Sequence, residues 1–253
     1  MDAVLRGLSD RLRAAGCVFA EDEAALLIAN EPDAVAREAL VARRVAGEPL
    51  ETVLGWVLFG GLRLAVEPGV FVPRRRTELV ARLAAKYLPQ GGTLVDLCCG
   101  VGAIAAVVAH ERPDARVIAA DFDPRAVAVA ARNLEPYDAT ALVSDMDANI
   151  SLPVDVMTAC PPYVPTREIQ FMPSEARDFE PRFALDGGED GTDLQAAVFA
   201  AAARRLTPGG AVIVETSAAL VERTAQRAVE AGLNPSVGQD EELGATVVVS
   251  RRA

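Results

Sequence analysis

Apolar and charged positions alternate at helical spacing through the first 49 residues. Apolar residues recur every three or four positions over residues 4–12, 24–28 and 35–45. This spacing keeps them on one face of a helix, so three short helices are predicted. Breaks are expected at Gly16, at residues 30–32 and at residues 47–49, because glycine ends helices and proline cannot continue them. The pattern predicts a separate helical domain over residues 1–49.

Shorter apolar runs of β-type residues follow, at residues 52–54, 56–59 and 62–66, with glycines between them. Such runs predict a β-hairpin connector over residues 50–75. The connector leads into a helix that is expected to run from Thr77 to about Leu88. Thr77 is expected near the N-cap of this helix, since threonine accepts hydrogen bonds there.

From residue 91 onward, buried-strand runs alternate with amphipathic helices. Strands are predicted at residues 93–97, 116–120, 140–143, 154–159, 211–216 and 245–250, and helices at 102–111, 124–134, 192–206 and 218–231. This alternation is typical of a parallel sheet with helices on both faces. The predicted fold class is α/β, with a Rossmann-like sheet in a catalytic domain over residues 76–253. Residues 164–191 are too long for a simple connection and predict a functional insertion near the active site.

Composition narrows the class of protein. Hydrophobic residues make up 51% of the 253 residues, yet none of their runs is long enough to cross a bilayer. The first six residues carry an acid and no apolar core of a secretory signal, so a cytoplasmic location is expected. Four irregularly spaced cysteines predict free thiols. A single histidine, His110, without a CxxC pair gives no ligand set for a metal.

The net charge of −11 argues against a nucleic-acid partner, because so acidic a chain repels a phosphate backbone. The densest basic cluster is residues 74–76. Three arginines on one turn are more often solvated or tied to a loop than part of a nucleic-acid tract.

The strand at residues 93–97 ends in a glycine turn that suits a nucleotide-like ligand. Gly100 and Gly102 let the backbone pass close to a ligand, and the following helix presents free N–H groups. A tight strand–helix turn needs glycine anyway, so this turn alone leaves both interpretations open. The turn lacks the third glycine of a dinucleotide fingerprint, which favours a shorter adenosyl ligand over NAD.

The ends of the next strands strengthen the ligand interpretation. Asp121 is placed to accept hydrogen bonds from a ribose diol, while Asp123 and Pro124 can begin the helix and leave Asp121 free. Asp145 could accept from an adenine amino group, with Met146 packed on the ring, although an acid that merely starts a loop is the simpler alternative.

The strand at residues 154–159 ends in the turn Cys160–Pro161–Pro162–Tyr163. Prolines fix the backbone and donate no N–H, so the carbonyls of Cys160 and Pro161 can point outward as acceptors. A planar amino group held there, with Tyr163 against its face, would direct its nitrogen at an electrophilic methyl group. A Pro-Pro-Tyr turn is usually just a turn, but this one lies at the sheet edge where ligands bind.

Together these motifs resemble the HemK/PrmC family, the S-adenosylmethionine-dependent methyltransferases that modify the glutamine amide of the GGQ motif in peptide release factors. The resemblance covers nearly the whole chain. Residues 47–50 look like the family's linker, residues 70–78 like its proline–arginine motif, and residues 180–191 like its long insertion, which few other methyltransferases carry.

The resemblance implies a release factor as partner, recognised with the help of the helical domain, and a connector through Arg74 that closes over the cofactor. It implies catalysis by Cys160, Pro161, Pro162 and Tyr163. The implied S-adenosylmethionine site consists of Arg74, Thr77, Asp96, Cys98, Cys99, Gly100, Val101, Gly102, Asp121, Phe122, Asp145 and Met146.

Two positions depart from the family pattern. Cys160 stands where the family has the asparagine that accepts from the substrate amide, and a thiol is a weak donor and acceptor. Cys98 replaces the first glycine of the cofactor loop, which a small side chain tolerates where φ is negative.

Other interpretations remain open because of Cys160. The acceptor could be an amine of a small molecule or peptide, or the chain could bind cofactor or partner without catalysis. A base amine of DNA or RNA is a further alternative, since Pro-Pro-Tyr turns also occur in methyltransferases that act on nucleic acids. Cys160 as a nucleophile lacks support, since His110 belongs to the helix after the first strand of the sheet. The sequence predicts no oligomeric state.

Overall fold

The structure, a computed structural model, describes residues 3–252. The prediction about a secretory signal used the first six residues, and two of these, Met1 and Asp2, lie outside the described residues. The chain starts with a lobe of three helices, α1 (Ala3–Ala14), α2 (Ala20–Asn30) and α3 (Ala34–Val45). Their apolar faces meet in a small core around Leu12, Leu27 and Val41, so the three predicted helices are confirmed.

A short helix, α4 (Leu50–Leu54), and a hairpin of β1 (Trp56–Phe59) and β2 (Leu62–Ala65) connect this lobe to the sheet. The predicted β-type run at residues 52–54 is wrong. Val53 and Leu54 belong to α4 because both pack into the core of the helical lobe, and Gly55 ends the helix at a φ of 80°. Packing overrides the local β propensity here. The domain limits at residues 49 and 75 stay a prediction.

The second part of the chain forms a seven-stranded sheet in the order β5-β4-β3-β6-β7-β9-β8. The strands are β3 (Thr93–Leu97), β4 (Arg116–Asp121), β5 (Ala139–Val143), β6 (Val154–Ala159), β7 (Leu206–Thr216), β8 (Asn234–Asp240) and β9 (Ala245–Arg251). Strands β3 to β7 are parallel, and β9 runs antiparallel to both of its neighbours. The predicted α/β Rossmann-like fold is confirmed. The edge strand β8 escaped prediction because its residues are mostly polar or turn formers.

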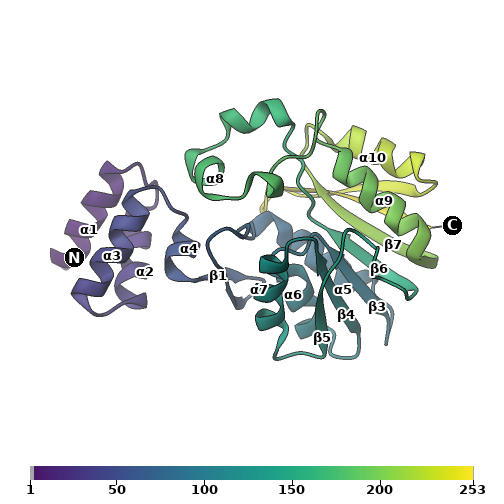
Figure 1. Cartoon of the computed structure of the whole chain (residues 1–253), viewed down its shortest axis with the longest axis horizontal. Coiled ribbons are helices and arrows are strands. Elements are labelled where there is room, and N and C mark those ends of the chain that lie inside the picture. Colours follow the sequence, from purple (N-terminus) through teal and green to yellow (C-terminus); the bar gives the residue numbers. More distant parts are fainter. Residues whose placement is uncertain (1–2, 253) are drawn as a thin grey trace.

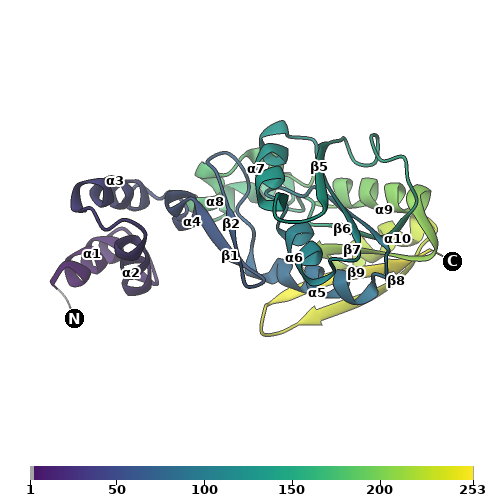
Figure 2. The ribbon, with the colours of Figure 1, turned by 90° about the horizontal axis from the view of Figure 1, so that it is seen from below.

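Helices cover both faces of this sheet (Figures 1 and 2). They are α5 (Glu78–Tyr87), α6 (Ala103–Glu111) and α7 (Pro124–Leu134) on one face, and α9 (Asp193–Arg205) and α10 (Val221–Glu230) on the other. Asp123 caps α7 through Arg125 N, as predicted. Thr77 lies at the N-cap position of α5, but its side chain donates or accepts no capping hydrogen bond; the 3₁₀ turn η1 (Arg75–Thr77) begins the helix instead.

The insertion predicted at residues 164–191 holds η2 (Thr166–Phe171), α8 (Ser174–Phe179) and η3 (Arg182–Ala184). Figure 1 shows α8 between the helical lobe and the sheet. Arg44 of α3 joins the two parts, because its guanidinium contacts Glu23 within the lobe and Glu175 of α8 at 3.1 Å. The insertion is therefore tied to the helical lobe as well as to the sheet.

Over residues 3–252, the helices are all too short or too polar to cross a membrane.

Candidate functional site

A cavity of about 1060 Å³ opens at the carboxyl ends of β3, β4 and β6. Parallel strands present these ends at one edge, so the loops that follow them share its walls. Residues between 69 and 77 and the insertion form further walls. Of the sequence-predicted site residues, the following line it: Thr77, Cys98, Cys99, Gly100, Val101, Asp121, Phe122, Asp145, Met146, Cys160 and Pro162.

The turn after β3 has a left-handed backbone where it borders the cavity. Cys98, Gly100 and Gly102 all have positive φ, at 52°, 54° and 77°. The condition under which a small side chain replaces this glycine without strain, a negative φ, is therefore not met at Cys98. The turn needs three left-handed residues, and holding a non-glycine residue there costs about 1–2 kcal/mol. A Cβ added to Gly100 would meet nothing within 4 Å. The backbone at this position is open to a ligand.

Asp121 at the end of β4 is shared between the turn and the cavity. Its carboxylate accepts from Gly100 N at 2.9 Å and from Asp123 N at 3.0 Å, so it is less free than the sequence predicted. Burial raises the pKa of Asp121, and the two backbone hydrogen bonds oppose that rise. A carboxylate can accept about four hydrogen bonds, which leaves places for two further donors.

The loop after β5 supplies the next wall. Asp145 and Met146 both line the cavity, and Met146 has a positive φ of 47°. Ser144 holds this conformation, because its hydroxyl donates to the carbonyl of Met146 at 2.8 Å. Asp147, buried behind them, pairs with Arg204 of α9. The loop therefore presents one acid and one apolar side chain from a fixed backbone.

The turn Cys160–Tyr163 separates the large cavity from a second cavity of about 60 Å³. Cys160 and Pro162 line both cavities, whereas Pro161 and Tyr163 line only the smaller one. Burial raises the pKa of the Cys160 thiol well above its ordinary value, so the thiol keeps its proton and is no activated nucleophile. His110 packs edge-on against Tyr137 and lines neither cavity.

An ion pair between the partly exposed Arg76 and the buried Glu215 holds this turn. The Tyr163 hydroxyl donates to Glu215 Oε1 at 3.0 Å, and Arg76 Nε donates to the same oxygen at 3.0 Å. Burial and the Glu215 carboxylate raise the pKa of Tyr163 far above its usual value, so the phenol stays neutral and donates. This matches the interpretation of residues 74–76 as arginines tied to a loop.

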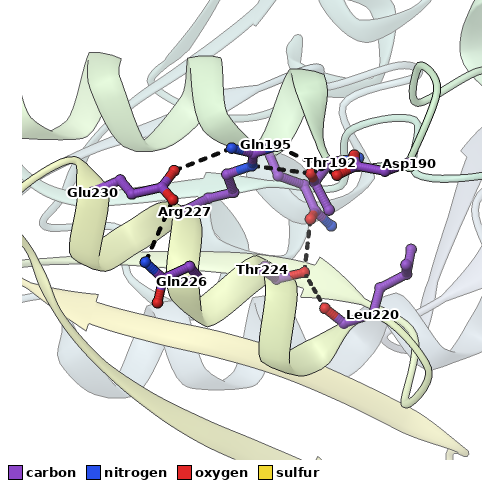
Figure 3. A network of polar contacts seen from close by, with 8 residues as sticks. All are labelled: Asp190, Thr192, Gln195, Leu220, Thr224, Gln226, Arg227 and Glu230. Carbon is purple, nitrogen blue, oxygen red and sulfur yellow. Dashed lines mark hydrogen bonds and ion pairs between the residues drawn. The ribbon is translucent and has the colours of Figure 1, made fainter.

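A polar network joins α9 and α10 (Figure 3), and its Gln195 also reaches the backbone of Glu215. The fully buried Gln195 of α9 donates to the backbone carbonyl of Glu215 at 3.2 Å and accepts from Thr224 of α10 at 2.7 Å. Arg227 of α10 donates to Thr192 at 3.1 Å, next to the start of α9. The end of β7 is therefore bonded to α9, and Gln195 links it in turn to α10.

Three further predicted residues lie outside the walls of the large cavity. Gly102 begins α6. Asp96 is fully buried beneath the glycine turn, where Thr158 donates to its Oδ1 at 2.8 Å. Arg74 pairs with the buried Glu180 at 2.6 Å and lies over the ring of Phe71.

Sequence reasoning missed Glu215, Phe183 and the role of Glu180. The Phe183 ring lies 5.0 Å, centroid to centroid, from the ring of the predicted Phe122. Glu180 also accepts from Val72 N at 3.1 Å, so it holds the connector over the cavity. The sequence signals for the region around Glu180 were the length of the insertion and its resemblance to the family's insertion.

The chemistry open to this site is limited. The thiols of Cys98 and Cys99 have pKa values raised by burial, and residues 3–252 contain no cluster of side chains suited to a metal ion. The site therefore offers binding and orientation, by backbone groups, carboxylates and apolar walls, rather than nucleophilic attack.

Comparison with known proteins identifies methyltransferases as relatives. Residues 61–175 match the family model "Methyltransferase small domain". A release factor glutamine methyltransferase from Geobacter sulfurreducens is 37% identical over 74% of this chain and 66% of its own length. One from Mycolicibacterium smegmatis is 39% identical over 83% of this chain and 76% of its own length.

Among solved structures, a methyltransferase from Pyrococcus furiosus superposes with a TM-score of 0.58, at 18% identity, over 86% of this chain and 98% of its own. At that identity the likeness concerns the fold alone.

Proposed function

The chain belongs to the family of release factor glutamine methyltransferases, the HemK/PrmC family, and from this premise we propose that it transfers a methyl group from S-adenosylmethionine to a side-chain amide nitrogen. The acceptor that the relatives' names indicate is a glutamine of a peptide release factor. One observation carries the proposal: the turn at residues 160–163 forms a wall of the same cavity as the glycine turn, Asp121 and Asp145.

The residues present fit an adenosyl cofactor. The open backbone at Gly100 suits close approach, and Asp121 keeps two acceptor places for a ribose diol. Asp145 and Met146 would hold the adenine ring by one hydrogen bond and one apolar face. Gly102 at the N-cap position of α6 has no side chain that could cap the helix, which favours a carboxylate of the ligand near this end.

When bound, the cofactor supplies an electrophilic methyl group on a sulfonium. The chain's own residues would bind and orient the acceptor. The carbonyls of Cys160 and Pro161 can accept from an amide N–H, since the two prolines fix their direction. The hydrogen bonds among Tyr163, Arg76 and Glu215 would keep that turn rigid. A rigid turn would hold the bound amide in the orientation that the transfer requires.

The helical lobe is proposed to help recognise the release factor. It stands apart from the sheet at one end of the molecule, and α8 links it to the cavity wall through Arg44 and Glu175 (Figure 2). A partner bound to the lobe would therefore lie next to the insertion that lines the cavity.

The experiment is methyl transfer from labelled S-adenosylmethionine to a peptide release factor, followed by mass spectrometry of the peptide that carries the GGQ glutamine. We expect one methyl group on that glutamine and none on a release factor in which it is replaced by alanine. Cofactor binding without transfer to any glutamine would contradict the proposed activity and favour a non-catalytic binding protein.

A further inference from the structure

The ends of β6 and β7 place Glu215 beside the proposed catalytic turn. The parallel pairing of these strands runs to Ala159 and Val214, and the next residues along the two strands are Cys160 and Glu215. Paired residues of neighbouring strands point to the same face of a sheet. The Glu215 carboxylate also raises the pKa of the Cys160 thiol, as expected for two groups in proximity.

Glu215 is only half satisfied. Its side chain is 1% exposed, and Oε1 accepts from both Arg76 and Tyr163. Oε2 is buried and has no hydrogen-bond partner among the described residues. A buried carboxylate oxygen without a donor is unfavourable, because it has given up its hydrogen bonds to water. Such an oxygen next to a proposed catalytic turn points to a missing donor.

We propose that Glu215 is a positioning residue, whose Oε2 anchors the side chain at position 160 and so determines how well the site holds an amide acceptor. This inference rests on the proposed function. An asparagine at position 160 can donate an N–H to Oε2 and keep its own oxygen for the acceptor. Cys160 has one weakly donating S–H and a weakly accepting sulfur, so it fills both roles poorly.

Thr77 competes for the same thiol. Its Oγ1 lies 3.9 Å from Cys160 Sγ, the limit of a hydrogen bond to sulfur, and either atom can be the donor. If the S–H points to Glu215, Thr77 donates to the sulfur; if it points to Thr77, Oε2 remains empty. The direction of one S–H group therefore decides whether Glu215 acts on position 160 in this chain.

Infrared spectroscopy can show which group accepts the hydrogen bond from the Cys160 S–H, and it needs no methyl transfer. The S–H stretching band of Cys160 is obtained as the difference between the wild type and Cys160→Ser. We expect Glu215→Gln to move the band to higher frequency, because an amide oxygen accepts more weakly than a carboxylate. Asp155→Asn is the matched control: Asp155 lies on β6, the strand that Cys160 follows, but at the opposite end of that strand, and it accepts from Thr93 N.

An unmoved Cys160 band in Glu215→Gln would overturn the proposal, as would an equal shift in the Asp155→Asn control. If Glu215→Gln does not fold, Glu215→Asp replaces it. That variant keeps the charge but withdraws the carboxylate by one methylene, and the same band shift is expected.

Kinetics test the same anchor during catalysis. Cys160→Asn should raise kcat/KM for the release factor about tenfold or more, the effect of one hydrogen bond to a charged group. In the Glu215→Gln background the rise should be about threefold at most. The affinity for S-adenosylhomocysteine should be the same in the wild type and in Glu215→Gln, because Glu215 does not line the large cavity.

Equal rises in both backgrounds would overturn the role of Glu215. Absence of methyl transfer in every variant would refute the proposed function, while the infrared band would still decide whether Glu215 anchors position 160.

Discussion

The free energy of unfolding should fall as the pH rises toward neutrality, because the buried Asp96 then loses its proton. Asp96 is fully buried on β3, with one oxygen bonded to Thr158 and the other, Oδ2, without a partner among the described residues. Burial raises its pKa from 3.8 to about 7; the Thr158 hydrogen bond opposes the rise and the charge of Asp121 adds to it. The folded state therefore holds this proton at a pH where the unfolded chain has lost it.

The sign follows from this difference. The stabilising contribution is fully present below the unfolded pKa and is lost as the pH rises through the folded one, because folding takes up a proton between them. A pKa raised from 3.8 to about 7 corresponds to roughly 4 kcal/mol, at about 1.4 kcal/mol per tenfold change in proton affinity. Asp96→Asn cannot ionise and keeps the oxygen that Thr158 contacts, so it should remove this slope.

The assay is urea unfolding of wild type and Asp96→Asn, followed by circular dichroism from about pH 5 to about pH 8. Asp147→Asn is the control: Arg204 and Arg205 lower the pKa of Asp147, so its contribution is lost only as the pH falls. Asp147→Asn should leave the slope between pH 5 and 8 unchanged. Parallel curves for wild type and Asp96→Asn would refute the reasoning.

Three further outcomes are expected. Asp121→Ala should weaken S-adenosylhomocysteine binding about 10- to 100-fold in calorimetry, since it removes the proposed ribose acceptor and the partner of Gly100 N; wild-type affinity would contradict the ribose role. Gly187→Ala should lower kcat/KM about tenfold or more, because its Cβ would lie 2.6 Å from Tyr163 Cα and displace the turn; an unchanged kcat/KM would contradict the role of this turn. Gly102→Ala should cost about 1–2 kcal/mol in thermal unfolding, given its φ of 77°, whereas Gly7→Ala in open space should not destabilise.

Local sequence patterns were sufficient to predict most of the helices and strands. The strands at residues 93–97 and 154–159 and the helix at residues 124–134 match the structure residue for residue, because buried runs and the Asp123–Pro124 cap mark their ends. The errors arose where tertiary contacts decide. Residues 52–54 form a helix against the lobe, and the polar edge strand β8 exists only through its pairing with β9.

The residues of the site that lie at the ends of parallel strands could be predicted from the sequence. Asp121, Asp145 and Cys160 each follow a parallel strand, and such residues gather at one edge whatever the details of packing. Glu180 and Glu215 were not predictable in this way, since their partners Arg74 and Arg76 lie 106 and 139 positions away in the chain. The left-handed backbone of Cys98 likewise follows from the turn and not from its residue type.

The account depends most on the cavity that joins the adenosyl-binding loops to the turn at residues 160–163. A crystal structure of the complex with S-adenosylhomocysteine tests it most directly. We predict the adenine between Asp145 and Met146, the ribose on Asp121, and the sulfur directed toward Cys160. A ligand bound elsewhere, or bound here with its sulfur turned away from that turn, would contradict the account.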